Sequence, residues 1–389
     1  MDILLLKGGL DIQVQAVNKT QKEKKMKKII VAVAALALMA GTAYADDAWN
    51  FYGSARVSTF WTDADVDGGD DPNTQFDEGL QSNARIGANV KVSDELIGAF
   101  EYGADDGNAN IRLLYGEWDF GAGKLLIGKD YVPLNLTGSN QVYMDDGALE
   151  GYGGELYGSR RAQIKLTFGD FQIAFVENNT NYAAYDAVNV VSPESDADVD
   201  VIMPKIEIKY ALTGDNWAVV MVGGYQTFDV DNGTVDDDVT SWGLGVDASA
   251  TFGGFFVTAQ VNGGTNVGNL WLIDVTGFNP DDDAIGKGYA EVAGNRIIDN
   301  DAIGGRICLG YTFNDMFAVE VGYGYQQTEL DISRADEIES QSYYINFPIT
   351  LAPGVVITPE IGVVDYTVDD LASGQEDITY FGAKWQINF

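Results

Sequence analysis

The chain has 389 residues, with 23 Lys and Arg against 59 Asp and Glu, and it contains no histidine. The absence of histidine excludes Ser-His and Cys-His nucleophile pairs and His-ligated zinc, so we expect no enzyme of those classes. A single cysteine, Cys308, cannot form an intrachain disulfide. A formal charge of −36 opposes binding to phosphate backbones, so nucleic acid is not an expected partner.

The amino-terminal segment has the pattern of a secretory signal peptide. A basic start at Met26 is followed by an apolar run from Ile29 to Leu38 and by an Ala-x-Ala ending at Ala45. We therefore predict cleavage after Ala45, and we interpret residues 1–25 as an upstream extension without a fold; a buried helix is the alternative. Cleavage would remove seven lysines and three acidic residues, which leaves 16 basic and 56 acidic residues in residues 46–389.

Beyond the leader, apolar and polar residues alternate with a period of two. From Ser82 to Val92 the even positions are apolar and the odd positions are polar or small, and residues 379–389 repeat the pattern. Successive side chains of a strand point to opposite faces, so each segment has one apolar and one polar face. We find no sustained helical period and no apolar run of membrane-helix length after Ala45.

Turn-forming residues divide the chain into sixteen predicted strands. These are Trp49–Thr62, Gly79–Val92, Glu95–Gly103, Asn110–Phe120, Lys124–Val132, Arg160–Phe168, Phe171–Glu177, Val201–Leu212, Asn216–Phe228, Val239–Phe252, Gly254–Gly263, Ala302–Phe313, Met316–Leu330, Ser340–Leu351, Gly354–Val368 and Glu376–Phe389. Short turns such as Ser93-Asp94 alternate with long acidic or Gly-rich connections such as Gly264–Asp301.

An even number of antiparallel strands, with short turns at one end and long loops at the other, is typical of an outer-membrane β-barrel. Only a closed cylinder leaves no backbone group unpaired in hydrocarbon. Aromatic residues near strand ends, such as Trp61 and Trp385, would then form belts at the two membrane interfaces. A soluble β-sandwich could also show alternation, but sandwiches seldom keep it over sixteen strands.

The sequence resembles the general trimeric porins of Gram-negative bacterial outer membranes over essentially all of residues 46–389. The matching pieces are Phe51-Tyr52-Gly53-Ser54-Ala55-Arg56, Asn83-Ala84-Arg85-Ile86-Gly87, Asn110-Ile111-Arg112-Leu113, Leu149-Glu150-Gly151-Tyr152-Gly153-Gly154-Glu155, Arg161 before Phe168, and the terminal Trp385-Gln386-Ile387-Asn388-Phe389. The resemblance implies an all-β, sixteen-stranded barrel with short periplasmic turns and a third external loop folded into the lumen. It also implies a homotrimer, contact with lipid and lipopolysaccharide, and recognition of Phe389 by the barrel-assembly machinery. One departure is Ser54, where the family often has a basic residue.

Charged residues on two sides of the expected lumen are the candidate site. Parity places the basic residues on the polar, inward faces of their strands: Arg56, Arg85, Arg112 and Arg161. The longest early loop, Pro133 to Ser159, carries the acidic residues Asp145, Asp146, Glu150 and Glu155, and we expect it to bend inward and narrow the channel. Opposed charges would create a transverse field across the lumen. The alternative is that the arginines only hold the loop by ion pairs.

One acidic segment is similar to the start of a calcium loop. Asp63, Asp65 and Asp67 occupy its first three ligand positions and Gly68 follows, but Thr74 stands where a bidentate Glu is required. We therefore favour a solvated acidic loop, and we expect no metal site and no cofactor.

The sequence as a whole predicts an outer-membrane porin for passive diffusion of ions and small hydrophilic solutes. The excess of acidic residues favours cations. A solute-specific porin and a plugged structural or adhesive barrel remain open as alternatives.

Overall fold

The computed structural model describes most of residues 48–389. The described residues are 48–66, 74–105, 108–184, 190–191, 198–231, 233, 235–275, 285–293, 296–332, 337–367 and 375–389. The expected signal peptide and upstream extension lie outside them, as do Asp67 and Gly68 of the calcium-like segment.

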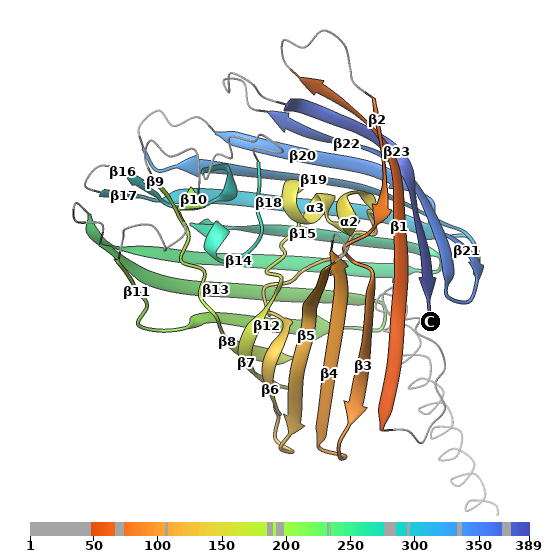
Figure 1. The fold of residues 1–389 in the computed structure, drawn as a ribbon, viewed down its shortest axis with the longest axis horizontal. Coiled ribbons are helices and arrows are strands. Elements are labelled where there is room, and N and C mark those ends of the chain that lie inside the picture. The colour runs from red at the N-terminus through yellow and green to blue at the C-terminus, as the bar shows by residue number, and fades with distance from the viewer. Residues whose placement is uncertain are drawn as a thin grey trace, which may run out of the picture.

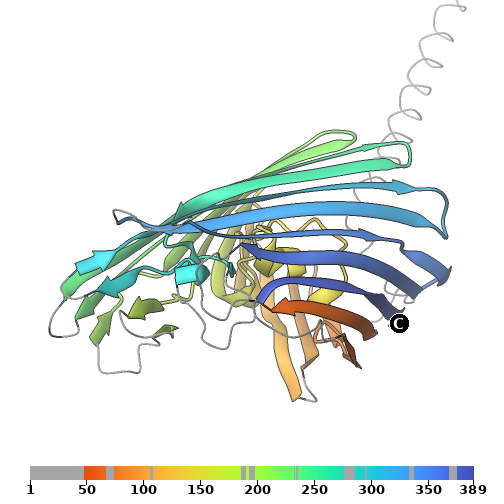
Figure 2. The same cartoon turned by 90° about the horizontal axis from the view of Figure 1, so that it is seen from above.

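One large antiparallel sheet forms the molecule (Figures 1 and 2). Its strands are β1 (Trp49–Val66), β2 (Gln75–Leu80), β3 (Arg85–Lys91), β4 (Leu96–Asp105), β5 (Asn108–Asp119), β6 (Lys124–Tyr131), β7 (Arg160–Phe168), β8 (Phe171–Val176), β11 (Asp198–Asp200), β12 (Lys205–Thr213), β13 (Trp217–Asp231), β14 (Asp236–Phe252), β15 (Phe255–Thr265), β18 (Asn300–Thr312), β19 (Ala318–Leu330), β20 (Ile338–Asn346), β21 (Ile349–Ala352), β22 (Val355–Thr367) and β23 (Gln375–Asn388). The last strand pairs with the first, from Ser54↔Asn388 upward, so the sheet closes.

Three of the sixteen positions around the barrel are each made by two consecutive strands. β2 and β3 both pair with β1, β11 and β12 both pair with β13, and β20 and β21 both pair with β22. The 19 strands of the sheet therefore make a sixteen-stranded barrel, which confirms the predicted fold class and strand number.

Two predicted strands are interrupted in the structure. Gly79–Val92 breaks at residues 81–84, and Ser340–Leu351 breaks at Phe347-Pro348. Pro348 has no backbone N–H to donate to the ladder, which accounts for the second break. The first strand is longer than predicted because β1 continues to Val66, so Asp63 lies in a strand rather than in a loop.

Exposure along the strands is the reverse of that in a soluble protein. Large apolar side chains on the outer face are exposed, among them Ile86, Leu114, Ile127, Leu244, Val261, Ile303 and Trp385. Polar side chains on the inner face are buried, among them Arg56, Glu101, Gln226, Arg306, Glu320 and Glu360. An apolar outside and a polar inside are the pattern of a barrel whose outer solvent is hydrocarbon.

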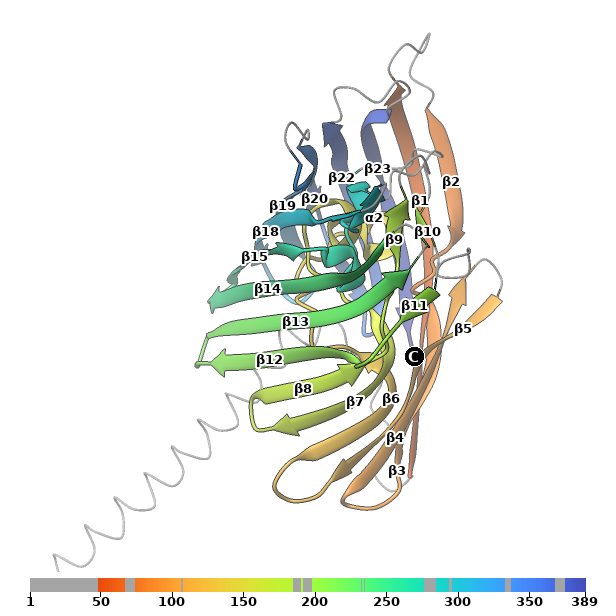
Figure 3. The same ribbon diagram turned by 90° about the vertical axis from the view of Figure 1, so that its left-hand side faces the viewer.

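The connections after β6, β8 and β15 carry the remaining elements. They hold the short helices α2 (Tyr143–Asp146) and α3 (Ala148–Tyr152), the 3₁₀ turns η1 (Val267–Asn269) and η2 (Ile285–Lys287), and a small four-stranded sheet of β9 (Tyr182–Ala184), β10 (Val190–Val191), β16 (Glu291–Ala293) and β17 (Arg296–Ile298). In the described part of the chain, no helix is both long and apolar enough to cross a membrane. Figures 1 and 3 show α2 and α3 inside the ring of strands.

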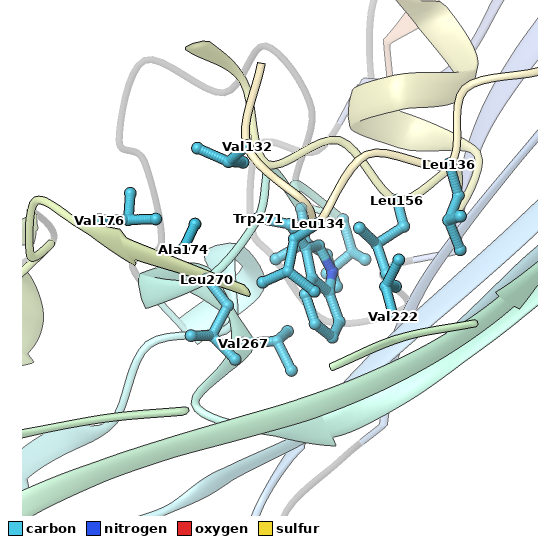
Figure 4. Close-up of a cluster of buried hydrophobic side chains, with 12 residues drawn as sticks. Val132, Leu134, Leu136, Leu156, Ala174, Val176, Val222, Val267, Leu270 and Trp271 are labelled. Atoms are coloured by element: carbon cyan, nitrogen blue, oxygen red, sulfur yellow. The ribbon is translucent and has the colours of Figure 1, made fainter. Parts of the chain in front are cut away.

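The barrel interior also contains an apolar core. Leu134, Leu136 and Leu156 from the connection after β6 pack against Leu270 and Trp271 from the connection after β15 (Figure 4). Wall residues of β8 and β13, including Val176 and Val222, complete the cluster. The polar inner faces alone would suggest a water-filled interior. Two connections instead bury apolar side chains against part of the wall, so that part of the interior is dry.

Candidate functional site: a charged interior

The segment 133–159, called here the inner segment, is held to the wall by carboxylates. Glu207 of β12 accepts a hydrogen bond from the backbone N–H of Leu134 (3.1 Å). Glu320 of β19 accepts one from the backbone N–H of Asn140 (2.7 Å). Glu360 of β22 accepts two, from the backbone N–H groups of Val142 (2.8 Å) and Tyr143 (3.0 Å). Charge-assisted hydrogen bonds of this kind are about twice as strong as neutral ones, so the wall fixes the path of the segment across the lumen.

Asp146 is the point where the inner segment meets the basic wall. Its carboxylate lies 2.6 Å from the guanidinium of Arg56 on β1 and 2.6 Å from the ammonium of Lys384 on β23. Gln81 also donates to it, at 3.2 Å. Burial alone would raise the pKa of Asp146, but the charges of Lys384 and Arg56 outweigh burial and hold the pKa below its usual value.

The turn that carries Asp146 has an uncommon backbone. Met144, Asp145 and Asp146 have φ values of 53°, 59° and 71°. Each left-handed, non-glycine residue costs of order 1 kcal/mol or more, so the surrounding contacts must hold the turn in place. Asn83 provides one such contact, since its side-chain amide donates to the carbonyl of Asp145.

Arg112 and Arg85 share a second carboxylate, that of Glu101 on β4. Arg112 Nε lies 2.6 Å from Glu101 Oε1, and Arg85 Nη1 lies 3.6 Å from the same oxygen. Tyr52 also donates its hydroxyl to Glu101, at 2.9 Å. The ladder between β4 and β5 changes register after Glu101, so that Glu101 faces Leu113 and Tyr102 faces Ile111. This bulge turns Arg112 inward, although the periplasmic half of β5 places the even residues Leu114 and Trp118 outside.

Arg161 and Glu155, two further predicted residues, form ion pairs that differ in burial. Arg161 lies 3.9 Å from Glu177, and both side chains are partly exposed to solvent. Glu155 is buried and lies 2.6 Å from Arg306 of β18, which also contacts Asp247 at 2.8 Å. Glu155 further accepts from the backbone N–H of Ser139, so its geometry is that of an anchor within the inner segment.

Asp145 and Glu150 are the two acidic residues of the inner segment for which the described residues show no cation within 4 Å. Both are partly exposed inside the barrel. Burial raises the pKa of Glu150 well above its ordinary value, and the nearby charges of Glu155 and Asp146 raise it further.

The sequence interpretation missed Lys384, Glu101 and the three anchoring glutamates. Lys384 stands on the polar face of the alternating terminal strand, so its inward direction was readable from parity. Glu207, Glu320 and Glu360 lie on inward faces as well, but their partners are backbone groups 73 to 218 residues away in the sequence. No local pattern indicates such partners.

No protein-family model matches the chain, and no curated protein matches it at a significant level. Solved structures do match. The outer membrane channel DcaP of Acinetobacter baumannii is 17% identical with a TM-score of 0.66, over 90% of this chain and 100% of that one. The anion-selective porin from Comamonas acidovorans is 12% identical with a TM-score of 0.57, over 88% and 100% of the chains.

The trimer form of OmpT, an outer membrane protein of Vibrio cholerae, is 18% identical with a TM-score of 0.55, over 88% of this chain and 100% of that one. Likeness at these identities establishes architecture. The chain has the closed β-barrel fold of outer-membrane porins and channels.

Proposed function

We propose that the mature chain is an outer-membrane porin, a water-filled channel through which ions and small hydrophilic solutes diffuse passively. The observation that carries the proposal is the set of charged residues on the inner face of a barrel whose outer face is apolar. Arg56, Arg85, Arg112 and Lys384 come from β1, β3, β5 and β23, and the inner segment brings Asp146 to them. Charged groups on a lumen wall are the means by which pores select among ions.

We further propose that the channel prefers cations. Residues 46–389 contain 16 basic and 56 acidic residues. In addition, Asp145 and Glu150 lack a cationic partner within 4 Å among the described residues. Arg56 and Arg112 are each within 2.6 Å of a carboxylate, which reduces the attraction that they exert on anions. The fold alone does not determine whether a channel prefers cations or anions, because the Comamonas acidovorans porin with this fold is anion-selective.

Two measurements test these statements. Liposomes that contain the refolded residues 46–389 should swell in solutions of small sugars, at rates that fall with solute size. A reversal potential measured across a salt gradient should have the sign of cation permeation. The proposal fails if the liposomes swell no faster than empty ones, and its selectivity part fails if the potential has the anion sign.

A plugged structural barrel is the second candidate, and the interior apolar core favours it. That core is contributed by two connections and by the wall at β8 and β13, whereas the basic residues near Asp146 and Glu101 lie on β1, β3, β5 and β23. A channel therefore needs to run beside these basic residues and not through the apolar core. Swelling that occurs only with ions or only with the smallest sugars would show how far the core closes the lumen.

We also propose a homotrimer, in line with the trimer form of OmpT from Vibrio cholerae. Lipid and lipopolysaccharide would contact the exposed apolar face. Recognition of Phe389 by the barrel-assembly machinery is proposed as well, since Phe389 ends the closing strand, where its backbone exchanges hydrogen bonds with Gly53 (2.7 and 3.0 Å).

A further inference from the structure

β2 has one edge that no strand covers among the described residues. It pairs with β1 from Val57↔Leu80 to Thr62↔Gln75, and all six of its residues are exposed. β3, which follows it at the same position of the barrel, pairs on both sides, with β1 and with β4. Figure 3 shows β2 beside β1 and above the ends of β4 and β5, with no strand along its other edge. About half of the backbone N–H and C=O groups of an edge strand point away from its only neighbour.

This edge lies at the depth of the expected hydrocarbon. Trp61 packs against Phe76 of β2 (ring centroids 4.6 Å apart) and Phe381, and marks the upper aromatic level. Trp49 and Phe51 mark the lower one. The ten residue steps from Phe51 to Trp61 span roughly 25 Å along the axis of a tilted barrel, which is the height of the apolar band. Unpaired backbone groups cost several kcal/mol each in hydrocarbon, so lipid alone cannot cover the edge.

Two opposite charges also face outward within this band. Glu78 of β2 lies opposite Thr59 on the outer face. Lys129 of β6 lies on the outer face, where its ladder neighbours Leu114 and Ala162 flank it with apolar surface. The described residues place no oppositely charged group within 4 Å of either side chain. A lysine that faces lipid costs about 2–4 kcal/mol at the midplane and less toward the interfaces.

These two side chains cannot meet within one chain. Three ladder steps, through β4 and β5 to β6, separate their positions, which corresponds to about 14 Å. Glu78 and Lys129 lie on different surfaces, so a contact between them joins two different faces of neighbouring copies. Such a heterologous contact closes into a ring when the rotation between copies permits.

We propose that the β2 edge of one copy lies on the outer face of β5–β7 of the next copy, with Glu78 paired to Lys129 between copies. The inference deepens the proposed homotrimer and rests on the proposed membrane insertion. Arg160 stands at the rim of the same face, where it donates to the Tyr131 hydroxyl (3.2 Å) and lies over the Tyr131 ring. Its remaining N–H groups and the Lys129 ammonium are donors that can satisfy the free carbonyls of β2. The contact thus gives donors to the free carbonyls of β2 and neutralises both charges.

Charge reversal tests the pairing. We expect Glu78→Lys and Lys129→Glu each to lower the assembled fraction about tenfold or more, and the double variant E78K/K129E to restore it. The fraction is measured by light scattering in detergent and by migration of unheated protein on gels. Glu329→Lys, which reverses an exposed outward-facing charge on β19, is the matched control and should assemble like the parent. Loss of assembly in the control, or no rescue in the double variant, overturns the pairing.

Cysteine cross-linking gives a second test that does not depend on stability. With Cys308→Ser as background, mixed samples of Glu78→Cys and Lys129→Cys should form covalent dimers between the two variants upon oxidation. The alternative occupant is a lipid phosphate on Lys129. It predicts that Lys129→Glu loses bound lipopolysaccharide, that the double variant is not rescued and that no cross-link forms, and this outcome overturns the inference. Cross-linked protein that conducts no ions would contradict the proposed channel and not the contact.

Discussion

Replacement of Asp146 by Asn tests whether the inner segment governs ion selection. Asp146 is shared by Arg56 and Lys384, each at 2.6 Å, so these three groups together carry a charge of +1. Asp146→Asn raises that charge to +2 with almost no change of volume. Glu207, Glu320 and Glu360 still hold the segment, so the barrel and its connection should remain folded.

The size of the effect follows from Coulomb's law. One added unit charge at about 6 Å from a passing ion changes its energy by about 0.7 kcal/mol in bulk water and by about 2.8 kcal/mol at an effective dielectric constant of 20. The added charge raises the energy of a cation and lowers that of an anion by the same amount, so the ratio of cation to anion permeability should fall by about tenfold at least and by about ten-thousandfold at most. The assay is the reversal potential in a planar bilayer across a tenfold potassium chloride gradient.

Glu155→Gln is the matched control, because it removes the same charge from the same segment. Glu155 is buried against Arg306, and Asp247 remains there to balance Arg306. We expect this control to keep a reversal potential close to that of the parent and to unfold at a lower temperature. A parental potential in Asp146→Asn, together with a shifted potential in Glu155→Gln, would refute the assignment of the selective charge.

Three further predictions follow from the interior. Glu150 has a raised pKa, so the folded state holds its proton more tightly than the unfolded chain does; its stabilising contribution is complete below the ordinary carboxylate pKa and is lost as pH rises through the raised value. Cation preference should accordingly fall as pH is lowered through the raised pKa of Glu150, and Glu150→Gln should flatten that part of a reversal-potential titration; an unchanged titration would contradict it. Glu360→Gln weakens two hydrogen bonds to the inner segment, and we expect a loss of about 1–3 kcal/mol, faster proteolysis of residues 133–159 and noisier currents; equal proteolysis rates would contradict this. Cation preference should also weaken between 0.1 M and 1 M salt, because the screening length falls from about 10 Å to about 3 Å; a salt-independent ratio would point to size rather than charge.

The barrel was predictable because strand periodicity is a local property. The alternation of apolar and polar residues around Ile86 and along residues 379–389 indicates which face of each strand is apolar. In the closed sheet the large apolar residues of these segments lie outside. The same parity placed Arg56, Arg85, Arg112 and Arg161 inward. Strand ends were less predictable where proline interrupts the ladder, as at Pro348.

Contacts between distant segments were not predictable. Arg112 was expected to point inward, but the bulge that lets it do so beside the outward Leu114 is revealed only by the pairing of β4 with β5. Glu155 meets Arg306 151 residues away, so its anchoring role is set by tertiary structure. The apolar run Leu270 to Ile273 was a visible signal within a long connection, but nothing local indicates that it packs against Leu134 inside the barrel.

The central claim is that an aqueous passage runs through this barrel beside the charged wall. Single-channel recording of refolded residues 46–389 in a planar bilayer tests it most directly. The structure predicts discrete, ohmic current steps upon insertion. Protein that inserts, as shown by protection of its strands from protease, and yet carries no current would contradict the claim and favour the plugged barrel.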